Sequence, residues 1–198
     1  AKKKEKIVVA SGKRGKIREI QETSKNYDVI SMREAGFDRE IDETGSTFEE
    51  NAVIKARAVS EALGCIALAD DSGLCVDALG GAPGVFSARY AGGHGDDGAN
   101  NALLLENMRS VPDEKRGAYF ESCVALCLKD GAVVTASGRT YGRILRAPDG
   151  EGGFGYDPVF FSGELGKNFG RASAEEKDAV SHRAKALAAL AQKIGGIL

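Results

Sequence analysis

Apolar runs and amphipathic segments alternate along the first third of the chain. Residues 7–10, 29–32 and 65–69 form short apolar runs with the length and composition of buried strands. Between them, apolar residues recur at helical spacing over 17–27 and 52–63. Strands that alternate with helices in this way predict an α/β fold built on a mixed sheet with flanking helices.

Capping residues mark the bounds of the second of these helices. Ser46 or Thr47 can accept a backbone hydrogen bond at its start, and Glu49 or Glu50 can complete a capping box. Gly64 follows the last apolar position and can end the helix in a left-handed conformation.

The second half of the chain adds a helix over 101–109 and then a different pattern. Apolar and polar side chains alternate over 117–129, a turn follows at 129–132, and strand-like residues continue over 133–141. This long antiparallel ribbon makes the protein more than a simple doubly wound sheet. An Ala/Leu-rich helix is expected over 181–194.

Composition narrows the class of protein. Hydrophobic residues make up 42% of the 198 residues and charged residues 28%, as in soluble globular proteins. The net charge of −2 leaves no overall field that would gather a polyanion, so we expect no nucleic-acid partner. No apolar run is long enough to cross a bilayer, and residues 1–6 lead into a strand rather than a signal-peptide core. We therefore expect no membrane partner and a cytoplasmic location.

The four cysteines form no CxxC pair, which argues against structural zinc and favours reduced thiols.

Candidate chemistry is concentrated in the stretch from 69 to 92. Asp70 and Asp71 directly follow the third apolar run, and we expect the strand to end there, with Ser72 and Gly73 turning the chain sharply. Adjacent strand residues point to opposite faces, so at most one of the two carboxylates can aim into a given site. The alternative is an ordinary loop, since Asp-Ser-Gly is common turn chemistry.

A basic glycine turn separates the first expected strand from the helix after it. Unpaired N–H groups at a helix start favour anions, and three cations within four residues add to that preference. We therefore expect a phosphate site, and the alternative is a solvated basic turn capped by Ser11. The turn consists of Ser11, Gly12, Lys13, Arg14, Gly15 and Lys16.

Two further segments carry polar side chains that could contact a ligand. Asn51 and Lys55 are four residues apart and share a helix face, although lysines on helices are usually solvated. A glycine loop carries Phe154, Tyr156 and Asp157, which suit a planar ligand such as a nucleobase; alternatively, its aromatic residues pack in the core.

His182 and Arg183 open the last expected helix. Cations in a first turn oppose the helix dipole, which indicates a bound anion or polar ligand rather than a contribution to helix stability.

Together these motifs carry a resemblance to a known family. They occur in order over nearly the whole chain, and the set is highly specific although each motif alone is weak. The sequence resembles the inosine triphosphate pyrophosphatase (ITPase) family, also called the non-canonical purine nucleoside triphosphate pyrophosphatases. The resemblance rests on residues 11–16, 43–45, 47–48, 50–52, 55–56, 69–74, 80–84, 87–90, 152–158 and 181–183.

The resemblance implies a fold and an activity. The fold would be a single ITPase-like domain over 1–198, with two lobes around a central cleft. The activity would be hydrolysis of a purine nucleoside triphosphate (ITP, dITP or XTP) to the monophosphate and pyrophosphate, which removes these nucleotides from the pool. Mg²⁺ would be required, and the family usually forms homodimers.

The resemblance also assigns roles to single residues. Asp71 resembles the catalytic proton acceptor, with Lys55 beside it, and the metal carboxylates would be Asp71, Glu43 and Asp70. Residues 11–16 and Ser72 resemble the phosphate-binding set. The base pocket would consist of Phe154, Gly155, Tyr156, Asp157, Lys177, His182 and Arg183, with Arg183 donating to a 6-keto oxygen.

Lys13 departs from the family pattern, which usually has Asn at this position. The added cation would strengthen triphosphate binding or change which phosphate is contacted. Two other functions stay open: a nucleotide pyrophosphatase acting on modified pyrimidine nucleotides, and a non-catalytic nucleotide-binding module.

Overall fold

The computed structural model of the chain describes residues 3–93 and 95–195. The chain divides into two compact units, which we describe separately. Unit 1 holds the described residues of Ala1–Asp71, Ser122–Gly138 and Arg183–Leu198, and unit 2 those of Ser72–Glu121 and Arg139–His182.

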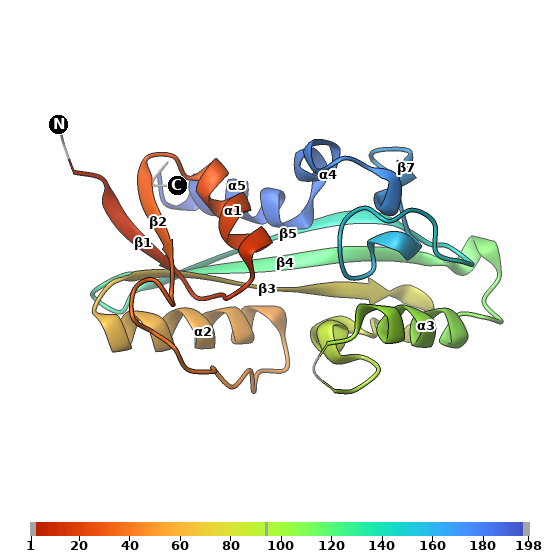
Figure 1. The fold of residues 1–198 in the computed structure, drawn as a ribbon, viewed down its shortest axis with the longest axis horizontal. Coiled ribbons are helices and arrows are strands. Elements are labelled where there is room, and N and C mark those ends of the chain that lie inside the picture. Colours follow the sequence, from red (N-terminus) through yellow and green to blue (C-terminus); the bar gives the residue numbers. More distant parts are fainter. Residues whose placement is uncertain (1–2, 94, 196–198) are drawn as a thin grey trace. The chain divides into compact units, whose positions relative to one another are not determined.

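Within the described residues, seven strands form a mixed sheet in the order β2-β1-β3-β4-β5-β6-β7 (Figure 1). β1 pairs in parallel with β2 and β3, whereas β5, β6 and β7 pair antiparallel. β4 and β5 are neighbours joined by a tight turn, in which the Leu128 N–H donates to the Ala132 carbonyl at 2.9 Å. The predicted mixed sheet and its long ribbon are therefore confirmed. The strands are β1 (Glu5–Val9), β2 (Tyr27–Ser31), β3 (Ile66–Val76), β4 (Gly117–Cys127), β5 (Val133–Ile144), β6 (Phe160–Ser162) and β7 (Lys167–Asn168).

Unit 1 covers both faces of its part of the sheet with helices. α2 (Phe48–Leu63) lies on one face, and α1 (Arg14–Thr23) and α5 (His182–Lys193) lie on the other (Figure 1). Strand alternation separates the two cores that result. Ile7 and Val9 pack with α1 and α5, whereas Val8 and Ala10 pack with α2.

The predicted N-cap and C-cap of α2 are confirmed, whereas the predicted capping box is not formed. The Thr47 side chain accepts a hydrogen bond from the Glu50 backbone N–H, and Gly64 ends the helix with φ of 60°. The Glu50 carboxylate accepts from the Ser46 N–H at 2.7 Å rather than from that of Thr47. The loop before α2 is therefore bound to the first turn of the helix.

The third predicted strand is longer than expected. β3 does not end at Asp70 but continues through Ser72 and Gly73 to Val76. Leu74 and Val76 have no exposed surface, and they extend the apolar pattern beyond the two aspartates. The expected sharp turn is therefore wrong, and both carboxylates lie in the middle of a strand.

Unit 2 contains α3 (Asp97–Asn107) and α4 (Ala174–Val180) around a core rich in Phe (Figure 1). α3 begins four residues before the predicted helix because Asp96 caps it, accepting from the Ala99 N–H at 3.0 Å. Five short 3-10 helices occur along the described chain: Asp77–Leu79, Gly84–Arg89, Asp113–Lys115, Asp157–Val159 and Phe169–Arg171.

Two further observations concern the helices and the cysteines. None of the helices in the described part of the chain has the length and apolar character to span a membrane. All four cysteines are free thiols, and only Cys65 is not buried.

Candidate active site

Strand alternation separates the two neighbouring aspartates of β3. The Asp70 carboxylate lies on the face covered by α1 and α5, where Oδ1 is 2.9 Å from Lys16 Nζ and Oδ2 accepts from Arg183 Nε at 3.1 Å. The Asp71 carboxylate lies on the face covered by α2, with Oδ1 3.7 Å from Lys55 Nζ. As predicted, the two acids serve different clusters.

The cluster around Asp70 is buried and contains two acids and two bases. Lys16 and Glu19 are three residues apart on α1 and share a face, and Glu19 Oε2 accepts from Arg183 Nη1 at 2.7 Å. At most 9% of the surface of each of the four residues is exposed. In this cluster a second carboxylate accompanies Asp70, so the cations are paired within the protein.

Charges shift the pKa values within this cluster. Burial raises the pKa of Asp70, but Lys16, Arg183 and Lys55 outweigh it and hold that pKa well below its usual range. Burial lowers the pKa of Lys16 to about 8, although Asp70 opposes the shift. Lys16 is therefore still mostly charged at neutral pH but loses its proton at a lower pH than an ordinary lysine.

Two expected roles do not agree with these positions. As a metal ligand, Asp70 would lie beside Asp71 and Glu43, yet its carboxylate pairs with Lys16 and Arg183 on the opposite face. Arg183 donates to Asp70 and Glu19 and is 4% exposed. Arg183 was expected to donate to a ligand in the base pocket. Its charge is instead neutralised by two buried carboxylates of the protein itself.

The second cluster places Lys55 among acidic groups. Its Nζ is 2.7 Å from Glu43 Oε1 and donates to the Asp70 backbone carbonyl at 2.6 Å. Burial lowers the pKa of Lys55, but the carboxylates of Asp70, Asp71 and Glu43 outweigh it and raise that pKa above its usual value. Burial raises the pKa of Asp71, and Lys55 only partly opposes this. Glu43, Lys55 and Asp71 are thus brought together, as expected.

Asn51 connects the loop of Glu43 with Asp71. It is 3% exposed, its Oδ1 accepts from the Gly45 N–H at 2.8 Å, and its side chain hydrogen-bonds Asp71. A Cβ added to Gly45 would lie 2.7 Å from Asn51 Oδ1, so only glycine fits there. The sequence placed Asn51 beside Lys55 but gave no sign of its bond to Gly45.

The carboxylates of Asp71 and Glu43 could supply two of the ligands of a magnesium ion. Within residues 3–93 and 95–195, no three His, Cys, Asp or Glu side chains lie close enough together to hold a metal. Asp71 Oδ2 is buried without a hydrogen-bond partner in the described chain, and Glu43 is nearby and partly exposed. Mg²⁺ prefers oxygen ligands and is often bound by one or two carboxylates together with phosphate oxygens.

The basic turn leaves its backbone accessible at the start of α1. Lys13 is the N-cap residue without a side-chain cap bond, and its N–H donates to Ser11 Oγ at 3.1 Å. A Cβ added at Gly12 or Gly15 would meet nothing within 4 Å. Lys13 and Arg14 are exposed, so the turn offers cations and free helix N–H groups to an anion.

In the described part of unit 2, the glycine loop over 150–157 and Lys177 of α4 form a further polar cluster. Lys177 forms an ion pair with the buried Asp157, and its Nζ lies 4.1 Å from the centroid of the Phe154 ring. Phe154 is 55% exposed, whereas the Asp157 carboxylate also accepts from the Phe154 N–H at 3.0 Å. A Cβ at Gly153 would lie 2.0 Å from Asp157 Oδ2, so this position requires glycine.

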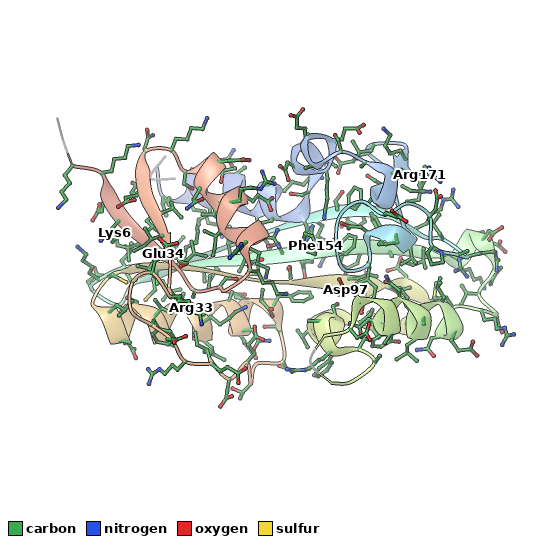
Figure 2. All side chains as sticks on the ribbon, viewed as in Figure 1. Lys6, Arg33, Glu34, Asp97, Phe154 and Arg171 are labelled. Atoms are coloured by element: carbon green, nitrogen blue, oxygen red, sulfur yellow. The ribbon has the colours of Figure 1, made fainter. Side chains whose placement is uncertain are left out.

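Helix α3 anchors the backbone of this loop. The Gly155 N–H donates to Asp97 Oδ2 at 2.9 Å, and Asn101 Nδ2 donates to the Gly155 carbonyl at 3.1 Å. Figure 2 labels Asp97, at the start of α3, and the exposed Phe154. The sequence did not indicate either anchor: Asp97 precedes the helix expected over 101–109, and the partner of Asn101 lies 54 residues away.

Tyr156 and His182 are built into the core of unit 2. The Tyr156 hydroxyl donates to the Ser87 carbonyl at 2.6 Å, and burial raises its pKa. His182 stacks on Phe120 with ring centroids 5.2 Å apart. Of the two aromatic residues on the loop, Tyr156 follows the core-packing alternative and Phe154 stays available to a ligand.

Ser72, which was expected in the phosphate-binding set, lies on β3 and is half-buried.

Comparisons with known proteins agree in pointing to one family. A model of the Ham1 family matches residues 7–193. The dITP/XTP pyrophosphatase of Clostridium perfringens is 46% identical over 98% of each chain, and that of Geobacter sulfurreducens is 48% identical over 96% of each. The solved Ham1 protein of Staphylococcus aureus has a TM-score of 0.89 and 40% identity, covering 96% of this chain and 98% of its own. The nucleoside-triphosphatase / dITP/XTP pyrophosphatase of Mycobacterium abscessus has a TM-score of 0.79 and 47% identity, covering 93% and 98%.

Proposed function

The chain belongs to the Ham1 family, and we propose that it hydrolyses non-canonical purine nucleoside triphosphates. The substrates are ITP, dITP and XTP, and the products are the monophosphate and pyrophosphate. The observation that carries the proposal is the Asp71 carboxylate, which has a buried oxygen without a partner in the described chain and lies beside Lys55 and Glu43. Relatives that share 46–48% of their residues with nearly the full chain bear the name of this activity.

The roles in unit 1 follow from the chemistry of attack by water at the α-phosphorus. Asp71 accepts a proton from the water, and its raised pKa makes it a stronger base than an ordinary aspartate. Glu43 and Asp71 would hold Mg²⁺, which when bound neutralises charge on the leaving pyrophosphate. We leave Asp70 out of the metal set because its carboxylate pairs with Lys16 and Arg183.

The triphosphate is bound by the basic turn and the first turn of α1. Lys13, Lys16 and the open backbone around Gly12 and Gly15 supply positive charge and N–H donors. Asp70 positions Lys16, whose Nζ it holds at 2.9 Å. Lys55 supplies a further cation next to the reacting phosphate.

The base is recognised by residues of unit 2. The exposed Phe154 ring stacks on the purine, a contact worth about 1–3 kcal/mol. Lys177, held over that ring and paired with Asp157, donates to the 6-keto oxygen. Adenine has an amino group at this position, which would leave one N–H donor of the ammonium without an acceptor at a cost of about 1–3 kcal/mol. We prefer Lys177 to Arg183 as this donor because Arg183 already binds two carboxylates.

Product analysis tests the proposal directly. Purified protein with Mg²⁺ is given ITP, XTP, dITP, GTP, ATP and dUTP, and pyrophosphate is resolved from orthophosphate. We expect pyrophosphate and IMP from ITP at a rate far above that from ATP or dUTP. Orthophosphate and a diphosphate product would mean attack at the γ-phosphorus and would contradict the role of Asp71.

Two properties of the family's proteins are also proposed for this chain. A homodimer is expected, and the Tyr119 and Tyr141 rings of the ribbon, 5.5 Å apart, offer an aromatic surface for it. Light scattering at micromolar concentration checks this, and a monomer would count against it. We place the protein in the cytoplasm, where nucleotide pools are used.

A further inference from the structure

Lys55 lies where a cation is needed between two carboxylates. Its Nζ is 2.7 Å from Glu43 Oε1 and 3.7 Å from Asp71 Oδ1. A third contact, at 2.6 Å, joins Nζ to the backbone carbonyl of Asp70. The ammonium thus balances the charges of the two residues that fit a metal ion.

The three contacts of Lys55 differ in how easily they open. The Asp70 carbonyl belongs to a central strand and cannot move away without breaking β3. Glu43 belongs to the loop before α2, and 35% of its side-chain surface is exposed, compared with 13% for Lys55 and 12% for Asp71. The contact that yields first is therefore the one between Lys55 and Glu43.

An ammonium has three donors, and the loss of Glu43 would leave one of them without an acceptor. An anionic phosphate oxygen of the substrate can replace the carboxylate. Glu43 is then released to bind a cation that arrives with the same nucleotide. The move of Lys55 from Glu43 to a phosphate oxygen would thus help to bind both the nucleotide and the metal ion.

We propose that Lys55 is an internal counter-ion that Mg²⁺ must displace from Glu43. This inference rests on the proposed function and adds a prediction about binding order. The free protein binds the metal weakly, because the ammonium already neutralises Glu43 and Asp71. Nucleotide draws Lys55 away and strengthens metal binding, and by linkage the metal strengthens nucleotide binding by the same factor.

Manganese binding to the full chain tests the inference without turnover. Mn²⁺ is titrated into wild type, Lys55→Met and Lys55→Gln at fixed pH, and free Mn²⁺ is measured by electron paramagnetic resonance. Without nucleotide, both variants should bind Mn²⁺ at least about tenfold more tightly than wild type, because a cation next to the site has been removed. An α,β-methylene analogue of ITP should tighten Mn²⁺ binding strongly in wild type and much less in the variants.

Controls separate this effect from general changes in charge or folding. Lys167→Met removes an exposed lysine that also lies 2.7 Å from a glutamate, Glu176, and it should leave Mn²⁺ affinity at the wild-type value. Adding Glu43→Gln to Lys55→Met should abolish the gain. Lys55→Gln keeps a donor for the Asp70 carbonyl, so it preserves the fold if Lys55→Met does not.

The outcomes distinguish this inference from the proposed function. Equal or weaker Mn²⁺ binding in a folded Lys55 variant overturns the inference, even when wild type releases pyrophosphate from ITP. If a Lys55 variant binds Mn²⁺ more tightly but the wild type does not hydrolyse ITP, the counter-ion role is supported and the proposed function is refuted.

Discussion

Neutralising Asp70 and Asp71 one at a time should impair different properties of the protein, although the residues are neighbours. The two carboxylates lie on opposite faces of β3 and have opposite pKa shifts. Asp70→Asn should mainly lower stability, and Asp71→Asn should mainly lower kcat. The pair is matched because each substitution removes one charge and keeps the side-chain shape.

The magnitude for Asp70→Asn follows from its partners. The residue is 4% exposed and pairs with Lys16 and Arg183, so its loss leaves buried positive charge with only Glu19 to balance it. Breaking a buried ion pair by removing one partner costs about 3–5 kcal/mol. For a chain of this length, each kcal/mol lowers Tm by about 2–4 °C, so Tm should fall by about 6–20 °C.

Asp71→Asn should leave the free energy of unfolding within about 1 kcal/mol of wild type. Burial raises the pKa of Asp71, which means that the folded protein already disfavours the charged form. Loss of the proton acceptor should lower kcat by about 10²- to 10⁴-fold.

Calorimetry and initial rates of pyrophosphate release check both variants. The pKa of Asp70 is lowered in the folded state, so its stabilisation is present above the unfolded pKa and is lost as pH falls through the folded value. The difference in Tm between wild type and Asp70→Asn should therefore shrink below about pH 4. Equal stability of Asp70→Asn and wild type at pH 7, or full turnover by Asp71→Asn, would refute the assignment of the two faces.

Three further predictions concern cations near the substrate. Lysine is charged only below its pKa, so kcat/KM for ITP should fall above about pH 8 as Lys16 loses its proton, and Lys16→Arg should remove this limb from the pH–rate profile. Lys13→Asn should raise KM for ITP severalfold with little change in kcat; steady-state kinetics with both constants unchanged would remove its phosphate role. Lys177→Met should lower kcat/KM about 5- to 150-fold for ITP and much less for ATP, and an equal loss for both nucleotides would contradict its role as base donor.

Local chemistry allowed much of unit 1 to be predicted from the sequence. Thr47 and Gly64 act through hydrogen bonds and backbone conformation within a few residues, so they marked the ends of α2 correctly. The separation of Asp70 and Asp71 followed from strand alternation alone. The joint position of Glu43, Lys55 and Asp71 agreed with the family resemblance, and their catalytic roles stay predictions.

Features that depend on distant segments could not be predicted in this way. β3 passes through Ser72 and Gly73 because neighbouring strands and a buried apolar face extend it, whereas local turn chemistry predicted a stop. The partners of Arg183 lie 113 and 164 residues away, so its sequence neighbours gave no sign of them. The anchor of Asp97 on Gly155 likewise joins residues 58 apart.

The lysine between Glu43 and Asp71 has a consequence for folding as well, because it offsets the repulsion between the two acids. Many metal-dependent sites bring together acids whose mutual repulsion opposes folding until an ion binds. Here the compensating charge is part of the same polypeptide, on a helix whose ends are capped by local hydrogen bonds. Because Lys55 belongs to the chain, every newly made molecule carries this charge, whatever the magnesium concentration. We therefore expect the chain to fold equally well with and without magnesium, and the proposed requirement for the ion to apply to turnover alone.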